Sequence, residues 1–454
     1  MTRPSLVATL VGCLLTSISC TALAGGKAKP PGPPPMPGAE SLPAPAGDWL
    51  GPDLEKSVQL LSGEPFTRGN EIRFMVDGPE YFPVRLDLIQ NAASTIDLTT
   101  FLWCDDDAGL AVARALAEAS SVRHVRVRVM VDGLNNKDHD QAYKIMTDAH
   151  VHLVKFNPPS WGAQDVLKRA HEKIMVVDGE RALVGGANLC DEYMLTTAKR
   201  GMWHDQEFLA QGPVVARIQD RLDHTWNWVA HRENEVRLDP NLPYQIPLPI
   251  YKEPTPAPRA EVGSARAVFL YQQPLIRPDD EDRSMELYAR LFRSAKEHIL
   301  FYDAYLIPPK VIELALEDRA RNHVRVDIVT NSSGSNDMGP IFVQSSVTNY
   351  ARLMKAGAHI WESRKRTYHN KGFLVDRTML AVGSHNLTHI KNGESDLLTD
   401  DPAAMDRFEK MFADDQEGGD VGIYEVTPKI LIDKARTLGD QTYLIVGTWL
   451  HGLF

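Results

Sequence analysis

Short apolar runs rich in β-branched residues alternate with helix-like segments, and the whole alternation occurs twice along the chain. The helix-like and strand-like segments fall at 82–93, 96–101, 124–129 and 149–153 in the first copy, and at 287–295, 299–302, 323–328 and 356–360 in the second. Such a repeat indicates two copies of one structural plan that differ in loop length. Helices that alternate with short strands predict an α/β fold with helices flanking a mixed sheet.

Each copy ends in the same polar motif. The two motifs read His171-x-Lys173-x4-Asp178-x6-Gly185-Gly186-x-Asn188 and His369-x-Lys371-x4-Asp376-x6-Gly383-Ser384-x-Asn386. In both, an apolar strand (173–177 or 371–375), a turn at the aspartate and a return strand (182–184 or 380–382) predict a hairpin. The hairpin brings the asparagine back beside the histidine and lysine. We expect Asp178 and Asp376 to make turn hydrogen bonds away from that site.

Two such sets can grip one phosphate from opposite sides without a metal ion. A neutral imidazole is nucleophilic near pH 7, so one histidine can attack phosphorus, form a phosphohistidine and expel an alcohol. A histidine on the opposite side can protonate that alcohol and later deprotonate the acceptor. We expect the charge on the non-bridging oxygens to be stabilised by Lys173, Lys371, Asn188, Asn386 and the Ser384 hydroxyl. Two successive displacements predict retention of configuration at phosphorus.

Each histidine also needs a carboxylate on its second ring nitrogen to fix its tautomer. Asp205 follows the first motif and Glu394 follows the second. Our hypothesis assigns each acid to the histidine of its own half, so that Asp205 orients His171 and Glu394 orients His369.

The paired motifs resemble those of the phospholipase D superfamily. The similarity to the shorter bacterial cardiolipin synthases is greatest at 185–193, at 330–332 and at Asn392-x-Glu394. The resemblance implies an α/β/α sandwich of two homologous halves, related by pseudo-twofold symmetry, with one active site between them. It also implies that His171 is the nucleophile and His369 the general acid and base. Gly186 stands where the more general motif has serine, so the first half has one fewer hydroxyl donor.

The two ends of the chain differ in composition from its body. Arg3, an apolar stretch at 6–15 and the small residues at 22–24 predict a signal peptide at 1–24, with lipidation at Cys20 as the alternative. The remaining predicted regions are a proline-rich linker at 25–55, the two halves at 56–239 and 261–420, a proline-rich connector at 240–260 and a C-terminal extension at 421–454. We therefore expect an exported protein, periplasmic or membrane-associated on the outer side of the inner membrane.

The charged residues and the cysteines bear on which ligands the chain can bind and whether it can form a disulfide. A net charge of −11 argues against a general nucleic-acid binder. The basic residues before the motifs, at 168–169 and 364–366, form either a local positive funnel or a solvated surface. After signal cleavage Cys104 and Cys190 remain, and they either pair or stay separate thiols. The acidic turn at 105–107 is weak evidence for calcium, and the other histidines lack ligand spacing, so we expect no metal and no cofactor.

The function we expect is cardiolipin synthase-like phosphatidyl transfer, with phosphatidylglycerol as substrate and peripheral contact with the membrane. Trp161 and the tail at 443–454 are candidate lipid contacts, although packing explains such residues more often. A secreted phospholipase D hydrolase, the second hypothesis, uses the same chemistry with water as the acceptor. A nuclease and a catalytically silent lipid-binding protein are the third and fourth hypotheses. The acceptor, the acyl and headgroup preference and the oligomeric state stay open.

Overall fold

The structure is a computed structural model that describes residues 52–134, 140–159, 168–199, 201–237, 247–251, 260–276, 280–338, 340–388, 390 and 392–439. The predicted signal peptide, Cys20, Trp161, the tail from 440 onward and most of the linker and connector lie outside these residues. No helix within the described part is both long and apolar enough to cross a membrane.

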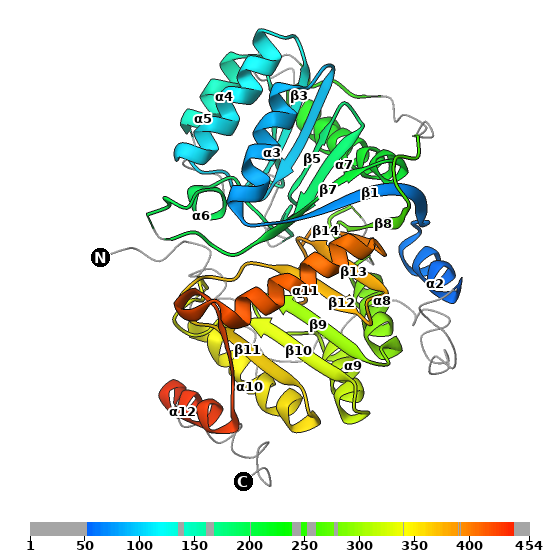
Figure 1. Cartoon of the computed structure of the whole chain (residues 1–454). Helices are drawn as coiled ribbons and strands as arrows, with labels where there is room; N and C mark the ends of the chain where they lie inside the picture. The colour runs from blue at the N-terminus through cyan, green and yellow to red at the C-terminus, as the bar shows by residue number, and fades with distance from the viewer. Residues whose placement is uncertain are drawn as a thin grey trace, which may run out of the picture.

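The two predicted copies fold as two halves with the same order of elements, apart from one short helix in the first half and the last three elements of the second (Figure 1). The first half contains β1 (Thr67–Val76), α3 (Gly78–Gln90), β2 (Thr95–Thr100), α4 (Asp107–Ser121), β3 (Arg126–Asp132), α5 (Asp140–Asp148), β4 (His152–Phe156), β5 (Ile174–Val177), β6 (Arg181–Gly185), α6 (Asp191–Met194), β7 (Gln206–Gln211) and α7 (Pro213–Arg237). The second half contains β8 (Ala265–Gln272), α8 (Asp280–Ser294), β9 (His298–Asp303), α9 (Lys310–Arg321), β10 (Arg325–Thr330), α10 (Pro340–Ala356), β11 (His359–Ser363), β12 (Lys371–Val375), β13 (Met379–Gly383), β14 (Glu394–Thr399), α11 (Pro402–Glu417), η3 (Gly419–Val421), β15 (Ile423–Glu425) and α12 (Pro428–Leu438). Each helix-like or strand-like segment predicted from the pattern overlaps one of these elements.

One continuous sheet runs through both halves. Its strand order is β15-β11-β10-β9-β12-β13-β14-β8-β1-β7-β6-β5-β2-β3-β4, so the order on one side of the β8–β1 pair mirrors the order on the other. In each half three strands are parallel (β2, β3, β4 or β9, β10, β11), and the motif hairpin (β5 and β6 or β12 and β13) is antiparallel. The pairing of Thr67 with Ala267 and of Asn70 with Ala265 joins the halves. This arrangement is the predicted pseudo-twofold relation.

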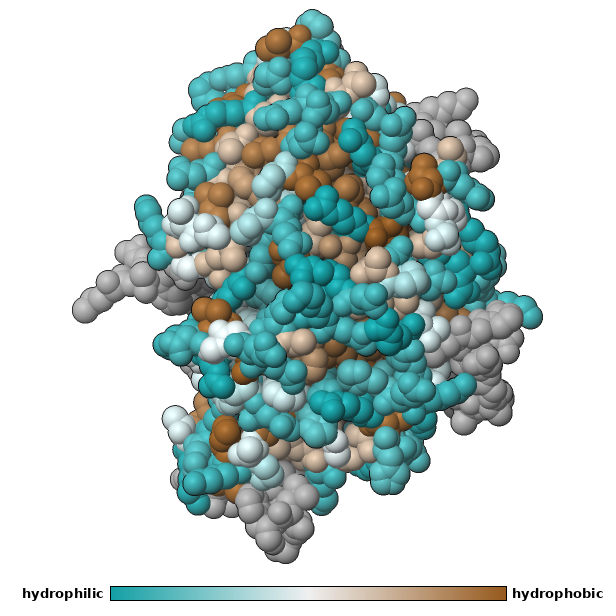
Figure 2. Space-filling view, in the orientation of Figure 1, coloured by the Kyte–Doolittle hydropathy of each residue, from teal (hydrophilic) through white to brown (hydrophobic). Residues whose placement is uncertain are grey.

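Helices cover both faces of the sheet, which gives three layers (Figure 1). Helices α3 to α6 pack on one face of the first half, and α8, α9, α10 and α12 pack on one face of the second. Helices α7 and α11 lie over a single hydrophobic cluster that includes residues of both halves. The strands are buried on both faces, which explains why they read as continuous apolar runs. In the view of Figure 2 the surface is largely hydrophilic, with apolar side chains visible in small groups.

The helix that precedes β1 crosses the predicted domain boundary. Helix α2 (Pro52–Ser62) begins inside the segment predicted as a linker, and its buried Leu54 and Val58 join the core of the second half. Helix α2 packs against α8, more than two hundred residues later in the chain. At the other end, β15 pairs with β11 and α12 packs against α10, so residues 423–438 of the predicted extension are part of the second half.

Candidate active site

The two histidine motifs meet at the interface between the halves. His171 and Lys173 lie just before β5, and His369 and Lys371 lie at the start of β12, so each pair sits at the same end of an equivalent strand. All four side chains are buried, with 1 to 7% of their surface exposed. Four buried groups that carry or can carry positive charge favour the binding of an anion beside the acids of the site.

Two short backbone bridges hold the motifs together across the interface. Ala170 pairs with Gly393, and His171 N donates to Gly393 O at 2.8 Å. In the same way His204 pairs with Tyr368, and His369 N donates to His204 O at 2.7 Å. The segment before each catalytic histidine therefore pairs with the segment before the acid of the other half.

This exchange overturns the predicted pairing of acids and histidines. His171 Nδ1 lies 2.9 Å from Glu394 Oε2, and His369 Nδ1 lies 2.7 Å from Asp205 Oδ2. The own-half assignment was therefore wrong, because the bridges carry each acid past the interface to the opposite histidine. A carboxylate on Nδ1 fixes the ring tautomer and leaves Nε2 for chemistry.

The electrostatics of the two histidine–acid pairs differ. Burial lowers the pKa of His171 to about 4, although Glu394 opposes this effect, and it lowers the pKa of His369 well below its usual value. Burial acts to raise the pKa of Glu394, but His171, His385 and Lys173 together outweigh it and leave that pKa lowered. For Asp205 burial prevails over Lys371 and raises the pKa to about 7. Glu394, beside His171, is thus ionised at neutral pH, whereas Asp205, beside His369, is only partly ionised.

The two lysines are held by the backbone of their own motifs. Lys173 Nζ donates to His171 O at 2.5 Å, and Lys371 Nζ donates to His369 O. Burial lowers the pKa of Lys173 to about 7 and that of Lys371 to about 8. A phosphate between them would favour their charged forms, since an opposite charge within a few ångströms raises a lysine pKa.

The remaining motif residues have different surroundings in the two halves. Asn188 Oδ1 accepts a hydrogen bond from Leu102 N at 3.1 Å, and the Asn188 side chain also hydrogen-bonds with Tyr193. Asn386 is partly buried, and its Oδ1 is one of the buried polar atoms of the described part that have no hydrogen-bond partner. The Ser384 hydroxyl donates to Glu394 Oε2 at 2.6 Å, so it holds an acid and does not face a phosphate as predicted.

The glycine that departs from the general motif makes room for an acid. A Cβ atom at Gly186 would lie 2.3 Å from Asp205 Oδ1, far inside van der Waals contact. The equivalent Ser384 instead bonds to the longer Glu394. Glycine therefore suits this position because Asp205 approaches its backbone.

Asp178 and Asp376 lie at the far ends of the hairpins. Asp178 accepts hydrogen bonds from the backbone N–H groups of residues 93–95, and Asp376 accepts them from those of residues 296–298. Both adopt a left-handed backbone conformation, with φ of 54° and 48°. They fasten each hairpin turn to the start of the neighbouring strand.

Aromatic rings pack against both histidines. The Phe101 ring meets His171 edge-on at 4.7 Å between centroids, and Lys173 Nζ lies 5.3 Å from the centre of the same ring. On the other side Tyr193 and Trp203 pack against His369 at 5.1 and 5.7 Å. These rings exclude water, which strengthens electrostatic interactions in the site.

Comparison with known proteins agrees with this geometry. Residues 86–226 and 288–416 match the family described as cardiolipin synthase, PLD-like domain, and each matched stretch contains one complete histidine motif. The chain belongs to this family. The match confirms the predicted superfamily, the phospholipase D-like fold and the enzyme class, a phosphatidyltransferase.

The relatives show how far the similarity extends. Cardiolipin synthase B of Escherichia coli (strain K12) is 28% identical over 332 residues, or 70% of this chain and 73% of the relative. Cardiolipin synthase 1 of Bacillus anthracis is 26% identical over 338 residues, or 74% of this chain and 63% of the relative. The crystal structure of phosphatidylserine synthase from Haemophilus influenzae Rd KW20 shares the fold, with a TM-score of 0.59 at 16% identity over 81% of this chain and 91% of that one.

Two polar residues to which the sequence analysis gave no role in the site hold the motifs of this phospholipase D-like site in place. Asp132, at the end of β3, accepts a hydrogen bond from Ala170 N at 3.2 Å. Asn331, just after β10, accepts one from Tyr368 N at 2.8 Å. Asp132 and Asn331 lie 199 residues apart, the offset of the repeat itself, and that offset is the signal that could have found them.

The basic residues before the motifs are largely engaged inside the protein. Arg169 is buried and pairs with Asp132 at 2.8 Å. Arg366 pairs with Asp77 at 2.7 Å and donates to backbone oxygens at 202 and 203. Lys365 is exposed and pairs with Asp420 at the surface. These contacts favour a structural role over the funnel that the sequence left open.

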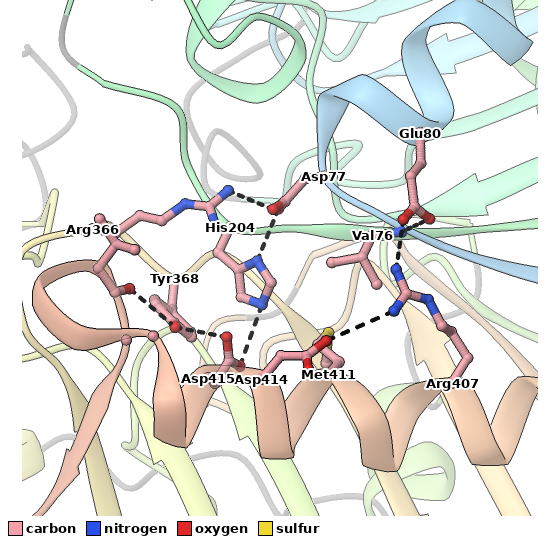
Figure 3. A pocket seen from close by; sticks show the side chains of 13 residues that line it. Val76, Asp77, Glu80, His204, Arg366, Tyr368, Arg407, Met411, Asp414 and Asp415 are labelled. Atoms are coloured by element: carbon pink, nitrogen blue, oxygen red, sulfur yellow. Dashed lines mark hydrogen bonds and ion pairs between the residues drawn. The ribbon is translucent and has the colours of Figure 1, made fainter.

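A pocket of about 280 Å³ lies between α11 and the start of α3, next to the active site (Figure 3). His204 forms part of its wall, with Nδ1 2.8 Å from Asp77 Oδ1 and Nε2 3.4 Å from Asp415 Oδ2. Burial alone would lower the pKa of His204, but the two carboxylates raise it to about 9. At neutral pH this imidazole is charged, and it contacts Asp77 of the first half and Asp415 of the second. It directly precedes Asp205 in the sequence.

The cysteines and the acidic turn have structural roles. Cys104 and Cys190 form a disulfide, which decides between pairing and separate thiols. Among the described residues they and Asp106 are the one His, Cys, Asp or Glu group close enough to share a metal ion, but both sulfurs are used in the disulfide. Asp106 caps α4, and Asp105 accepts backbone hydrogen bonds from 141 and 142, so these carboxylates bind backbone N–H groups.

Proposed function

We propose that the protein transfers a phosphatidyl group from one phospholipid to another through a phosphohistidine on His171. The observation that carries this proposal is the pair of buried histidines at the interface of the halves, each with a carboxylate from the other half and a lysine from its own. Such a site offers a nucleophile, an acid–base and two cations for one phosphodiester.

In the first step neutral His171 attacks phosphorus through Nε2, and the bond from phosphorus to the leaving alcohol breaks. His369 donates its Nε2 proton to that alcohol and takes up a proton at Nδ1 from Asp205, whose pKa of about 7 allows it to hold one. In the second step the incoming hydroxyl loses its proton to His369, Asp205 recovers its own, and the new oxygen displaces His171. Lys173 and Lys371 bind the non-bridging oxygens throughout.

Phosphatidylglycerol is the donor and acceptor we propose, because the relatives described above are named cardiolipin synthases. Peripheral contact with a membrane follows from a lipid substrate. We also propose that the protein is exported to the periplasm or the outer side of the inner membrane, since disulfides such as Cys104–Cys190 persist in oxidising compartments.

Purified protein supplied with phosphatidylglycerol vesicles, with and without excess glycerol, tests the function. We expect cardiolipin and glycerol as products, with cardiolipin decreasing when glycerol is in excess and with no loss of rate in EDTA. Phosphatidic acid as the sole product would identify a phospholipase D hydrolase instead. With a p-nitrophenyl phosphodiester, whose leaving group needs no proton, the variant His369→Asn should accumulate the covalent intermediate on His171. An intermediate on residue 369 of a His171 variant would reverse the two roles.

A further inference from the structure

The disulfide of the first half joins the two loops that carry its active-site residues. Cys104 lies three residues after Phe101, and Cys190 lies two residues after Asn188. The loops also share a short run of hydrogen bonds: Cys104 N donates to Leu189 O at 2.9 Å, and Leu102 N donates to Asn188 Oδ1 at 3.1 Å.

Residues close to each cysteine touch the catalytic histidines. Phe101 packs on His171, and Tyr193, three residues after Cys190, packs on His369. The disulfide therefore connects the segment that carries Phe101 to the segment that carries Asn188 and Tyr193. A shift of about 1 Å in such groups can cost roughly a hundredfold in rate.

The second half fastens the equivalent loops without a disulfide. Asp303, which is buried, accepts hydrogen bonds from Tyr305 N at 3.0 Å and from Leu387 N at 2.9 Å, and so ties the loop after β9 to the loop that carries Asn386. In the sheet Asp303 pairs with Lys371. The equivalent place beside Lys173 is occupied by Thr100, the residue after the pair Thr99–Ile174. Its hydroxyl donates to Leu102 O at 3.3 Å, within its own loop.

We propose that the Cys104–Cys190 disulfide is the positioning crosslink of the first half and takes the place that Asp303 has in the second, so that turnover depends on its oxidation. This inference rests on the proposed function for its main assay. Reduction converts the disulfide to two thiols while a dithiol reductant becomes its own disulfide, and reoxidation reverses the exchange. The loops then keep their hydrogen bonds but lose the covalent limit on their separation.

The test compares oxidised protein, protein reduced with dithiothreitol and the double variant Cys104→Ser/Cys190→Ser. Thiol titration verifies the redox state, and thermal unfolding verifies that each form is folded at the assay temperature. We expect kcat for phosphatidyl transfer to fall at least tenfold in the reduced and double-variant forms with KM within twofold, and reoxidation to restore the wild type. The double variant is the matched control, since reductant should not change its rate further.

Two further readouts separate this inference from the proposed function. Hydrolysis of a p-nitrophenyl phosphodiester reports on the site even if phospholipids are not its substrates, and hydrogen exchange reports on the loops without any turnover. We expect faster exchange at 101–104 and 188–193 after reduction, and no change at the equivalent loops of the second half. Folded, fully reduced protein with kcat within twofold of the oxidised form, or with unchanged exchange at these loops, would overturn the inference.

Discussion

Replacing Glu394 with glutamine tests the contact that joins the chemistry of the two halves. Glu394 Oε2 lies 2.9 Å from His171 Nδ1, and both side chains are buried. The carboxylate accepts the Nδ1 proton and leaves Nε2 free to attack phosphorus. An amide N–H₂ in the same place would donate to Nδ1 and move the ring proton to Nε2, which presents the unreactive tautomer to the substrate.

The expected loss follows from these contacts. A hydrogen bond to a charged group contributes about 1.5–3 kcal/mol, which at about 1.4 kcal/mol per factor of ten is roughly a 10- to 150-fold effect. The wrong tautomer adds to this, since the corresponding change in a Ser-His-Asp triad costs about 10⁴ in kcat. We therefore expect kcat of Glu394→Gln to fall by roughly 10² to 10⁴.

Single-turnover formation of the phosphohistidine is the measurement, with Asp205→Asn as the matched variant. Glu394→Gln should slow the step for phosphatidylglycerol and for a p-nitrophenyl phosphodiester alike, because the nucleophile itself is impaired. Asp205→Asn should slow it for phosphatidylglycerol but spare the p-nitrophenyl ester, whose leaving group needs no proton. The opposite pattern in the two variants, or a Glu394→Gln rate above a tenth of the wild-type rate, would refute these roles for the two acids.

Three other predictions follow from single side chains. The plot of kcat/KM against pH should be bell-shaped, rising as His171 loses its proton near pH 4 and falling as Lys173 loses its charge near pH 7, with the alkaline limb of kcat at higher pH because bound phosphate raises the lysine pKa. Gly186→Ala should reduce kcat at least tenfold, measured with phosphatidylglycerol, because its Cβ would displace Asp205. His204→Gln should destabilise the fold by about 3 kcal/mol at pH 6, estimated from a pKa raised from 6.5 to about 9, and this difference should vanish as pH rises through about 9. Denaturant unfolding of both proteins at pH 6 and pH 10 checks it, and an equal difference at both values would contradict the charge argument.

The elements and the catalytic set were predictable because their signals are local. Apolar runs, turn residues and the fixed spacing of each motif lie within about twenty residues, and the repeat supplies the same signal twice. The hairpin that returns Asn188 to His171 is such a case. The fold class followed from the alternation of helices and strands, since that alternation has few architectural solutions.

What the sequence could not show depends on contacts across the interface. Glu394 reaches His171 over 223 positions, and nothing local distinguishes this from pairing with His369. The two bridges that decide the matter consist of backbone hydrogen bonds, which leave no trace in residue type. Helix α2 is a similar case, because its Leu54 and Val58 fill a core built mainly of residues beyond 268.

The exchange of acids, combined with one difference between the motifs, gives two equivalent histidines different tasks. Burial opposes ionisation of Glu394, but His171 and the other nearby cations lower its pKa, and the Ser384 hydroxyl donates a further hydrogen bond to the same carboxylate. At the equivalent position Gly186 has no donor to offer Asp205, and burial keeps the pKa of that acid near 7. The ionised Glu394 supports His171 as the nucleophile. The partly protonated Asp205 supports proton transfer by His369. Because each acid serves the histidine of the other half, the serine of the second motif favours attack by the histidine of the first.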